Sequence, residues 1–204
     1  SGIGIESGFI GSELYNYFRD LFNNTKNVSS PIILDLDRDG VETTGLKDGA
    51  HFDHDGNGFA EQTGWASSDD GLLVLDKNGN GIIDNGTELF GNETLLQNGQ
   101  KAANGFQALE ELDGTHDGTI DVNDAAYTQL LLWQDVEGDG YSATDELFML
   151  NELGIKSINT GYTNSTYVDA NGNKHKQVGS YTRTDNSSAA ATDVWFKADK
   201  MYTI

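Results

Sequence analysis

The chain has 204 residues, of which 33 are Asp or Glu and only 12 are Lys or Arg, so its formal net charge is −21. So acidic a chain is poorly suited to bind DNA, RNA or an anionic membrane, because Lys and Arg provide most of the affinity for those partners. The absence of cysteine excludes disulfide frameworks, thiolate nucleophiles and cysteine-ligated zinc. No apolar run approaches the roughly 18 residues of a membrane-spanning helix. The carboxylates are therefore either dispersed and solvated or clustered to bind cations.

The N-terminal part differs in pattern from the rest of the chain. Residues 7–24 carry apolar side chains at helical spacing, which predicts an amphipathic helix. A polar stretch over residues 23–30 then precedes Pro31, the single proline. We therefore expect a helical arm and linker over residues 1–30 and one folded module over residues 31–204. Because the chain begins with Ser1 rather than Met, we expect it to be part of a longer protein.

The module shows both helical and β-like patterns. Helical spacing of apolar residues predicts three short helices, over residues 104–112, 122–134 and 144–152. The C-terminal part is β-like, and its Asn171-Gly172 pair favours a hairpin turn. The strands expected there cover residues 155–162, 167–168, 177–184 and 194–197. These patterns predict an α+β fold with a small antiparallel sheet.

Two twelve-residue segments match the EF-hand loop, which places oxygen ligands at positions 1, 3, 5, 7, 9 and 12 and glycine at position 6. They cover residues 113–124 and 135–146. The ligands predicted by this match are Asp113, Thr115, Asp117, Thr119, Asp121 and Asp124 in the first loop, and Asp135, Glu137, Asp139, Tyr141 and Glu146 in the second. Because helical patterns flank both loops, we expect an EF-hand pair. The alternative is two Asp- and Gly-rich surface turns.

Three more loops match the pattern less completely. The loop over residues 76–88 offers Asp76, Asn78, Asn80, Ile82, Asp84 and, one place after position 12, Glu88. Two others carry only the first half of the pattern: Asp35, Asp37, Asp39 and Val41 in one, and Asp53, Asp55, Asn57, Phe59 and Glu61 in the other. Glu42 or the Asp69-Asp70 pair could supply the missing ligands. The alternatives are an Asn-Gly hairpin for the first of these loops and polar turns after buried strands for the other two.

Calcium is the metal that these residues favour. The candidate ligands are almost all hard oxygens, which suit Ca²⁺ in flexible loops better than Mg²⁺, and the histidines form no cluster at zinc-ligand spacing. His54 and His116 fall at loop positions that normally point outward, so we expect them to be solvated. Trp65, Trp133 and Trp195 lie in apolar patterns and are expected in the core. Since binding energy is also folding energy, we expect an expanded calcium-free chain and a compact calcium-bound one.

Four segments resemble, in the same order, the self-processing modules of FrpC-like RTX proteins of Gram-negative bacteria. They read PIILDLDRDGVET at 31–43, TGWASSDDGLLVLDKNGNGIIDNGTELFG at 63–91, LWQDVEGDGYSATDEL at 132–147 and GSYTRTDNSSAAATDVWF at 179–196. The resemblance implies a secreted or cell-surface location through type I secretion, a larger RTX-type chain and folding induced by calcium. It also implies autocatalytic cleavage of an Asp–Pro bond at the N-terminal edge of the module. In that reaction the Asp attacks its own carbonyl, and the anhydride is hydrolysed or captured by a lysine as an isopeptide link.

The chain departs from this pattern at the scissile position, where Ser30 precedes Pro31. An aspartate attacking its own carbonyl closes a five-membered anhydride, whereas a serine hydroxyl would close a strained four-membered lactone. An N-to-O shift at Ser30 would break the bond before this residue. We therefore expect no catalytic residue and no cleavage here, and we predict a calcium-binding RTX-type module that folds on Ca²⁺. The alternative is a calcium-stiffened structural or adhesive segment of a large surface protein, with a host or cell-surface partner still to be identified.

Overall fold

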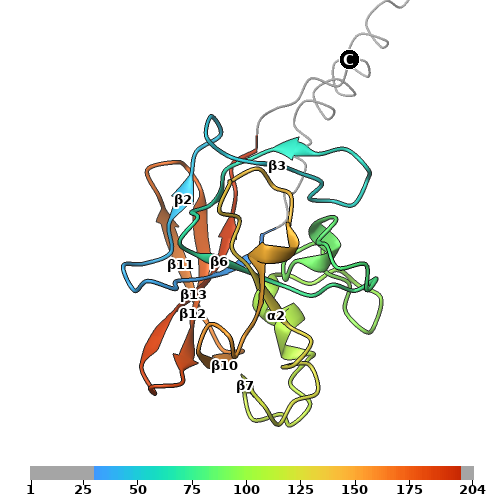
Figure 1. The fold of residues 1–204 in the computed structure, drawn as a ribbon, viewed down its shortest axis with the longest axis vertical. Helices are drawn as coiled ribbons and strands as arrows, with labels where there is room; N and C mark the ends of the chain where they lie inside the picture. The colour runs from blue at the N-terminus through green and yellow to red at the C-terminus, as the bar shows by residue number, and fades with distance from the viewer. Residues whose placement is uncertain (1–29, 199–204) are drawn as a thin grey trace, which may run out of the picture.

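The computed structural model describes residues 30–198, and these form an architecture that is almost entirely β (Figure 1). The helix predicted over residues 7–24 lies outside the described residues, as do the rest of the predicted arm up to residue 29 and the last six residues. None of the helices in the described part is long and apolar enough to cross a membrane.

Most of the fold is one nine-stranded antiparallel sheet that curls like half a barrel. Its order is β7-β10-β12-β13-β1-β6-β8-β9, with β11 also paired to β12. The strands are β1 (Ile32–Leu34), β6 (Gly71–Val74), β7 (Thr119–Ile120), β8 (Leu131–Trp133), β9 (Leu147–Met149), β10 (Ile155–Asn159), β11 (Thr163–Val168), β12 (Lys174–Arg183) and β13 (Ser188–Trp195). Two ribbons pair β2 (Thr43–Thr44) with β5 (Trp65–Ala66) and β3 (His51–Phe52) with β4 (Glu61–Gln62). The helical elements are α2 (Gly105–Glu110) and the 3₁₀ turns η1 (Gly86–Glu88) and η2 (Thr144–Glu146).

The prediction of an α+β fold with an EF-hand pair is wrong. Of the three predicted helices only the one over residues 104–112 forms, as the short α2. Residues 122–134 instead run through turns into β8, and residues 144–152 form η2 followed by β9. Because β8 pairs with β6 on one side and with β9 on the other, strand pairing in the sheet outweighs the local helical spacing of its apolar residues. The two loops therefore lack most of the flanking helices that define an EF-hand.

The β-like C-terminal part is confirmed. The predicted segments fall within or overlap β10, β11, β12 and β13. The Asn171-Gly172 turn joins β11 to β12, and Gly172 has the positive φ, 86°, that such a turn requires. The N–H of Asp169 closes this hairpin by donating to the carbonyl of Asn173 at 3.0 Å.

The core lies on both faces of the sheet, so the central strands are buried on both sides. In β1, Ile32 and Leu34 contribute to the apolar cluster that α2 covers, whereas Ile33 contributes to the opposite cluster, which contains Trp65 and Trp133. Both tryptophans are buried as predicted, but Trp195 is only half-buried. The position of β1 between β13 and β6 brings the junction between the predicted arm and module, at Ser30, into the interior.

Candidate metal-binding loops and the Ser30 junction

All five predicted loops share one backbone arrangement around their first Asp. The carboxylate of that residue accepts N–H bonds from residues three to five places further along the chain, which turns the loop around the carboxylate. The bonds are Arg38 to Asp35 at 2.7 Å, and Gly58 to Asp53, Gly81 to Asp76, Gly118 to Asp113 and Gly140 to Asp135, each at 2.8 Å. The four glycines donating here have φ between 76° and 88°, a conformation that favours glycine. The glycine spacing noted in the sequence thus has a direct backbone cause.

A second carboxylate closes each loop from the other side. It accepts the N–H of the second or third loop residue: Leu36 to Asp70 at 3.3 Å, His54 to Glu61 at 3.1 Å, Lys77 to Glu88 at 3.0 Å, Thr115 to Asp124 at 3.1 Å and Val136 to Glu146 at 2.8 Å. All five closing residues are buried. Each loop therefore brings together two carboxylates that are held by backbone N–H groups.

The first loop takes its closing carboxylate from a distant part of the chain. Asp70 accepts the N–H groups of both Leu36 and Glu42, the second at 2.8 Å. Of the residues considered for this role, Asp69 is exposed and Glu42 contributes its backbone N–H to Asp70. Burial raises the pKa of Asp70 to about 7, although the N–H groups of Glu42 and Leu36 act in the opposite direction.

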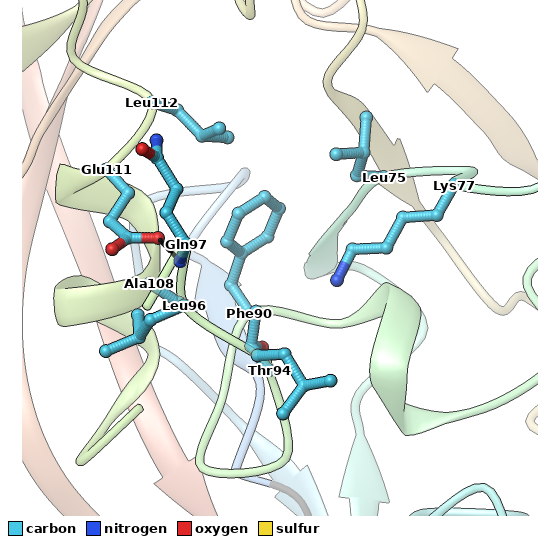
Figure 2. Close-up of a pocket in the computed structure, with 10 residues that line it drawn as sticks. Leu75, Lys77, Phe90, Thr94, Leu96, Gln97, Ala108, Glu111 and Leu112 are labelled. Carbon is cyan, nitrogen blue, oxygen red and sulfur yellow. Dashed lines mark hydrogen bonds between the residues drawn. The ribbon is translucent and has the colours of Figure 1, made fainter. Parts of the chain in front are cut away.

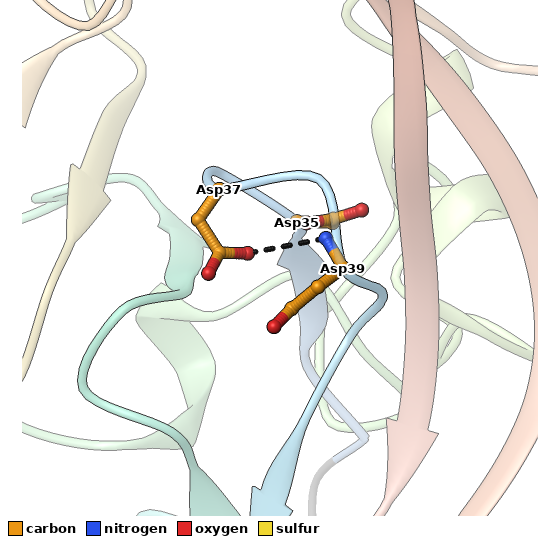
Figure 3. Close-up of side chains that lie close together, drawn as sticks. All are labelled: Asp35, Asp37 and Asp39. Carbon is orange, nitrogen blue, oxygen red and sulfur yellow. Dashed lines mark hydrogen bonds between the residues drawn. The ribbon is translucent and has the colours of Figure 1, made fainter.

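Two of the loops gather three carboxylates each. Oxygens of Asp35, Asp37 and Asp39 lie within 4.8 Å of one another, and Figure 3 shows the three side chains on the loop that follows β1. A hydrogen bond with Asp37, together with smaller effects, raises the pKa of Asp39 to about 6. Asp53, Asp55 and Glu61 form a second such group. Carboxylates crowded in this way repel one another. Their oxygens are the type of ligand that a hard divalent cation prefers.

The predicted pair of loops is not joined as it would be in an EF-hand pair. Ile120, in the loop over residues 113–124, pairs with Ile158 of β10. In the loop over residues 135–146, Ser142 accepts the N–H of Ile83 at 2.6 Å, which links this loop to the one over residues 76–88. The Gly86 N–H donates to the carbonyl of Asp53 at 2.8 Å, which adds a third loop to this group.

The Ser30–Pro31 bond lies in a rigid setting at the start of β1. Ser30 is fully buried, and its N–H donates to Asn92 Oδ1 at 2.9 Å. On the other side of the bond, the Pro31 carbonyl accepts the N–H of Val194 at 3.0 Å, and the Ile32 N–H donates to the Phe90 carbonyl at 3.2 Å. Three hydrogen bonds thus fix the backbone on both sides of this peptide bond.

Asp193 is a buried carboxyl group beside this junction that the sequence analysis missed. It pairs with Ile32 across the sheet, is fully buried, and its Oδ2 accepts the Gly105 N–H at 2.5 Å. Among the described residues, neither its Oδ1 nor Ser30 Oγ has a well-aligned hydrogen-bond partner. Burial raises the pKa of Asp193 to about 7, although the Gly105 N–H and the nearby Ser30 hydroxyl act in the opposite direction. The signal in the sequence was the position of Asp193 directly before the predicted strand over residues 194–197.

Comparison with known proteins places this architecture in a family. Residues 32–197 match the SPM domain. The chain belongs to the SPM domain family. It is also 48% identical over 179 residues to the iron-regulated protein FrpA of Neisseria meningitidis serogroup C. The match covers 87% of this chain but 16% of FrpA, so the chain spans about one sixth of the length of that relative. The predicted relationship to the modules of FrpC-like RTX proteins is confirmed at the level of the family.

Two histidines of this SPM domain are buried. His54 is buried against Phe52 and Trp65, and burial lowers its pKa to about 3. Its Nε2 lies 3.0 Å from Thr63 Oγ1. His175 is also buried and contacts Asp169 at 3.0 Å. The expectation that His54 is solvated is therefore wrong, whereas His116 is exposed as expected.

A shallow surface depression of about 200 Å³ borders the loop over residues 76–88 at Lys77 (Figure 2). Its lining is mainly apolar, with Leu75, Phe90 and Leu112 among the residues, and includes Lys77 and Glu111. Because it gathers no cluster of titratable groups, it does not resemble a catalytic site.

Proposed function

We propose that this SPM domain is a calcium-binding module of a larger, exported RTX-type protein, and that it folds when it binds Ca²⁺. The shared geometry of the five loops carries the proposal, because each loop fixes two carboxylates through backbone N–H bonds. The ligands in this proposal are those predicted from the sequence, with Asp70 rather than Glu42 or Asp69 completing the first loop. The module extends over residues 31–204 and follows an arm over residues 1–30.

Charge supports calcium-dependent folding. Five bound Ca²⁺ ions would change the formal net charge of −21 to −11. Without them, buried carboxylates such as Glu88, Asp124 and Glu146 must be desolvated near other acidic groups, which opposes collapse of the chain. Bound cations remove this cost, so metal binding and folding become one process.

The proposal includes a scissile position that does not react. The likeness of residues 31–43 to the start of self-processing modules supports Ser30–Pro31 as the position of the reacting bond, and a serine there has no route to a five-membered anhydride. We therefore propose that the rest of the cleavage architecture is present but silent. Ser30→Asp should give calcium-dependent cleavage before Pro31.

A calcium-stiffened structural or adhesive segment is the second candidate, and Ser30 is the observation that favours it. The substitution Ser30→Asp distinguishes the two functions experimentally. If Ser30→Asp folds on calcium but stays intact, the module serves as a structural segment only.

The experiment that tests calcium-dependent folding combines calorimetry with circular dichroism. Titration of the chelator-treated chain with Ca²⁺ should show four or five bound ions, together with a gain of β-sheet signal at the same stoichiometry. Mg²⁺ is the control and should produce little folding, because these loops do not offer its strict octahedral geometry. A spectrum that is identical with Ca²⁺ and with chelator would contradict the proposal.

A further inference from the structure

The side chains of Ser30 and Asp193 are two buried polar groups close to each other inside the protein. Both residues have no exposed surface, and each has a buried oxygen without a well-aligned partner among the described residues. An unpaired buried polar atom is costly, so natural proteins rarely keep one without a reason. The two residues are close together, since the Ser30 hydroxyl is near enough to lower the pKa of Asp193.

The elements around this pair hold it in place. Asp193 is on β13, directly opposite Ile32, and the Val194 N–H holds the Pro31 carbonyl. The first residue of α2, Gly105, donates its N–H to Asp193 Oδ2. A Cβ at position 105 would lie 2.2 Å from the Phe90 carbonyl oxygen, so a residue with a side chain would displace this donor. The carboxyl group is thus kept beside residue 30 by backbone contacts on two sides.

We propose that Asp193 is the proton donor of a latent cleavage centre at the bond between residues 30 and 31. This inference rests on the proposed function, in which position 30 is the position of the reacting Asp in related modules. A carboxyl group in this place can hydrogen-bond to an Asp side chain at position 30 and give its proton to the Pro31 nitrogen as the peptide bond breaks.

The reaction balances with these two groups alone. In a Ser30→Asp chain, the ionised carboxylate of residue 30 attacks its own carbonyl carbon and forms a five-membered anhydride. The bond from that carbon to the Pro31 nitrogen breaks, and its electron pair stays on nitrogen. The nitrogen takes the proton of the Asp193 carboxyl, which becomes a carboxylate. Water then opens the anhydride, and one of the protons released restores the Asp193 acid.

The groups around Asp193 favour its acid form in the resting state. Two carboxyl groups in contact share one proton, because like charges so close cannot both ionise at low cost. Burial disfavours the charged form of Asp193, and among the charged groups of residues 30–198 the Lys176 ammonium on β12 favours it electrostatically. The ammonium of Lys176 lies 3.6 Å from the ring centroid of Trp195.

The test compares three variants of the full chain at saturating Ca²⁺: Ser30→Asp alone, Ser30→Asp with Asp193→Asn, and Ser30→Asp with Asp48→Asn as a matched control at an exposed position. Cleavage is followed on a gel, and the new N-terminus is identified by mass spectrometry. We expect cleavage before Pro31 in the first and third variants, and a rate lower by about 10²–10⁴-fold in the second, the range typical of a lost general acid. Circular dichroism with Ca²⁺ establishes that each variant folds.

The possible results separate the two proposals. Equal rates in all three variants overturn the role of Asp193 but keep the proposed function. A Ser30→Asp chain that folds on calcium and stays intact overturns both the latent centre and its acid. Should Asp193→Asn prevent folding, the pH profile of Ser30→Asp decides: the rate must fall at low pH as residue 30 is protonated, and fall again at alkaline pH as Asp193 ionises, at a pH above the value of about 7 for the parent chain because a carboxylate at position 30 raises the pKa of Asp193 further. A rate that reaches a plateau and does not fall at alkaline pH overturns the role of Asp193.

Discussion

The indole Nε1–H of Trp65 donates to Asp135 Oδ2 at 2.7 Å, which connects the aromatic core directly to the first ligand position of a candidate calcium loop. Trp133 makes a similar contact, from its Nε1–H to Glu146 Oε2 at 3.3 Å, at the other end of the same loop. Both rings also pack against Phe52. The packing of this core and the positions of these carboxylates therefore depend on each other.

Trp65→Phe should weaken calcium binding at this loop by about 10–100-fold, because the variant loses a hydrogen bond that orients a ligand. Trp195→Phe is the matched control, since among the described residues its indole nitrogen has no hydrogen-bond partner. Calorimetric titration of both variants measures the effect. Equal affinities in the two would contradict a role for the Trp65 contact in metal binding.

The chain with its own Ser30 should stay uncleaved in Ca²⁺, because a serine at this position has no favourable cyclisation onto its carbonyl. Prolonged incubation with millimolar Ca²⁺, followed by electrophoresis and mass spectrometry, should show only the intact mass. A fragment that begins at Pro31 would disprove the chemical argument.

Gly86→Ala should destabilise the folded protein by more than about 2 kcal/mol. A Cβ at this position would lie 1.9 Å from the carbonyl oxygen of His54, where two candidate loops meet. Gly161→Ala is the control, because its Cβ would meet nothing within 4 Å, and we expect a change within about 0.5 kcal/mol. Urea unfolding with Ca²⁺ present gives both values, and equal midpoints would show that the loop contact is unimportant.

Leu132→Ala should cost about 2–5 kcal/mol of unfolding free energy, since Leu132 is fully buried in the cluster that α2 covers. Leu95→Ala should cost less than about 0.5 kcal/mol, because 61% of the Leu95 surface is exposed. The same unfolding assay compares the two variants. Similar losses from both would mean that β8 does not pack as described.

Stability in the presence of Ca²⁺ should depend on Asp193 between about pH 4 and pH 7. Burial raises the pKa of Asp193 from its ordinary value of 3.8 to about 7 in the folded chain, so the folded state holds this proton more tightly than the unfolded state. The resulting stabilisation is complete below pH 3.8 and is lost as the pH rises through about 7. Asp193→Asn cannot ionise, so it should lose less stability than the parent chain between pH 5 and 8. Parallel unfolding curves for the two chains across this range would contradict the assignment.

The sequence by itself determined those features that depend on residues close together in the chain. The Asp and Gly spacing of the loops is local, because the first carboxylate folds back on N–H groups only three to five residues away. The hairpin at Asn171-Gly172 is also local, because its turn depends on two adjacent residues. The burial of Trp65 and Trp133 was predicted from their apolar neighbours in the sequence.

The tertiary structure decided what depends on contacts between distant residues. Leu131–Trp133 has a helical pattern, but it forms a strand because β6 pairs with one of its edges and β9 with the other. Asp70 reaches the loop of Asp35, and Asp193 reaches Ser30, only because non-neighbouring strands pair in the sheet. Local spacing predicts how a carboxylate bends its own loop, whereas burial and long-range pairing determine which carboxylates meet and which of them keep a proton.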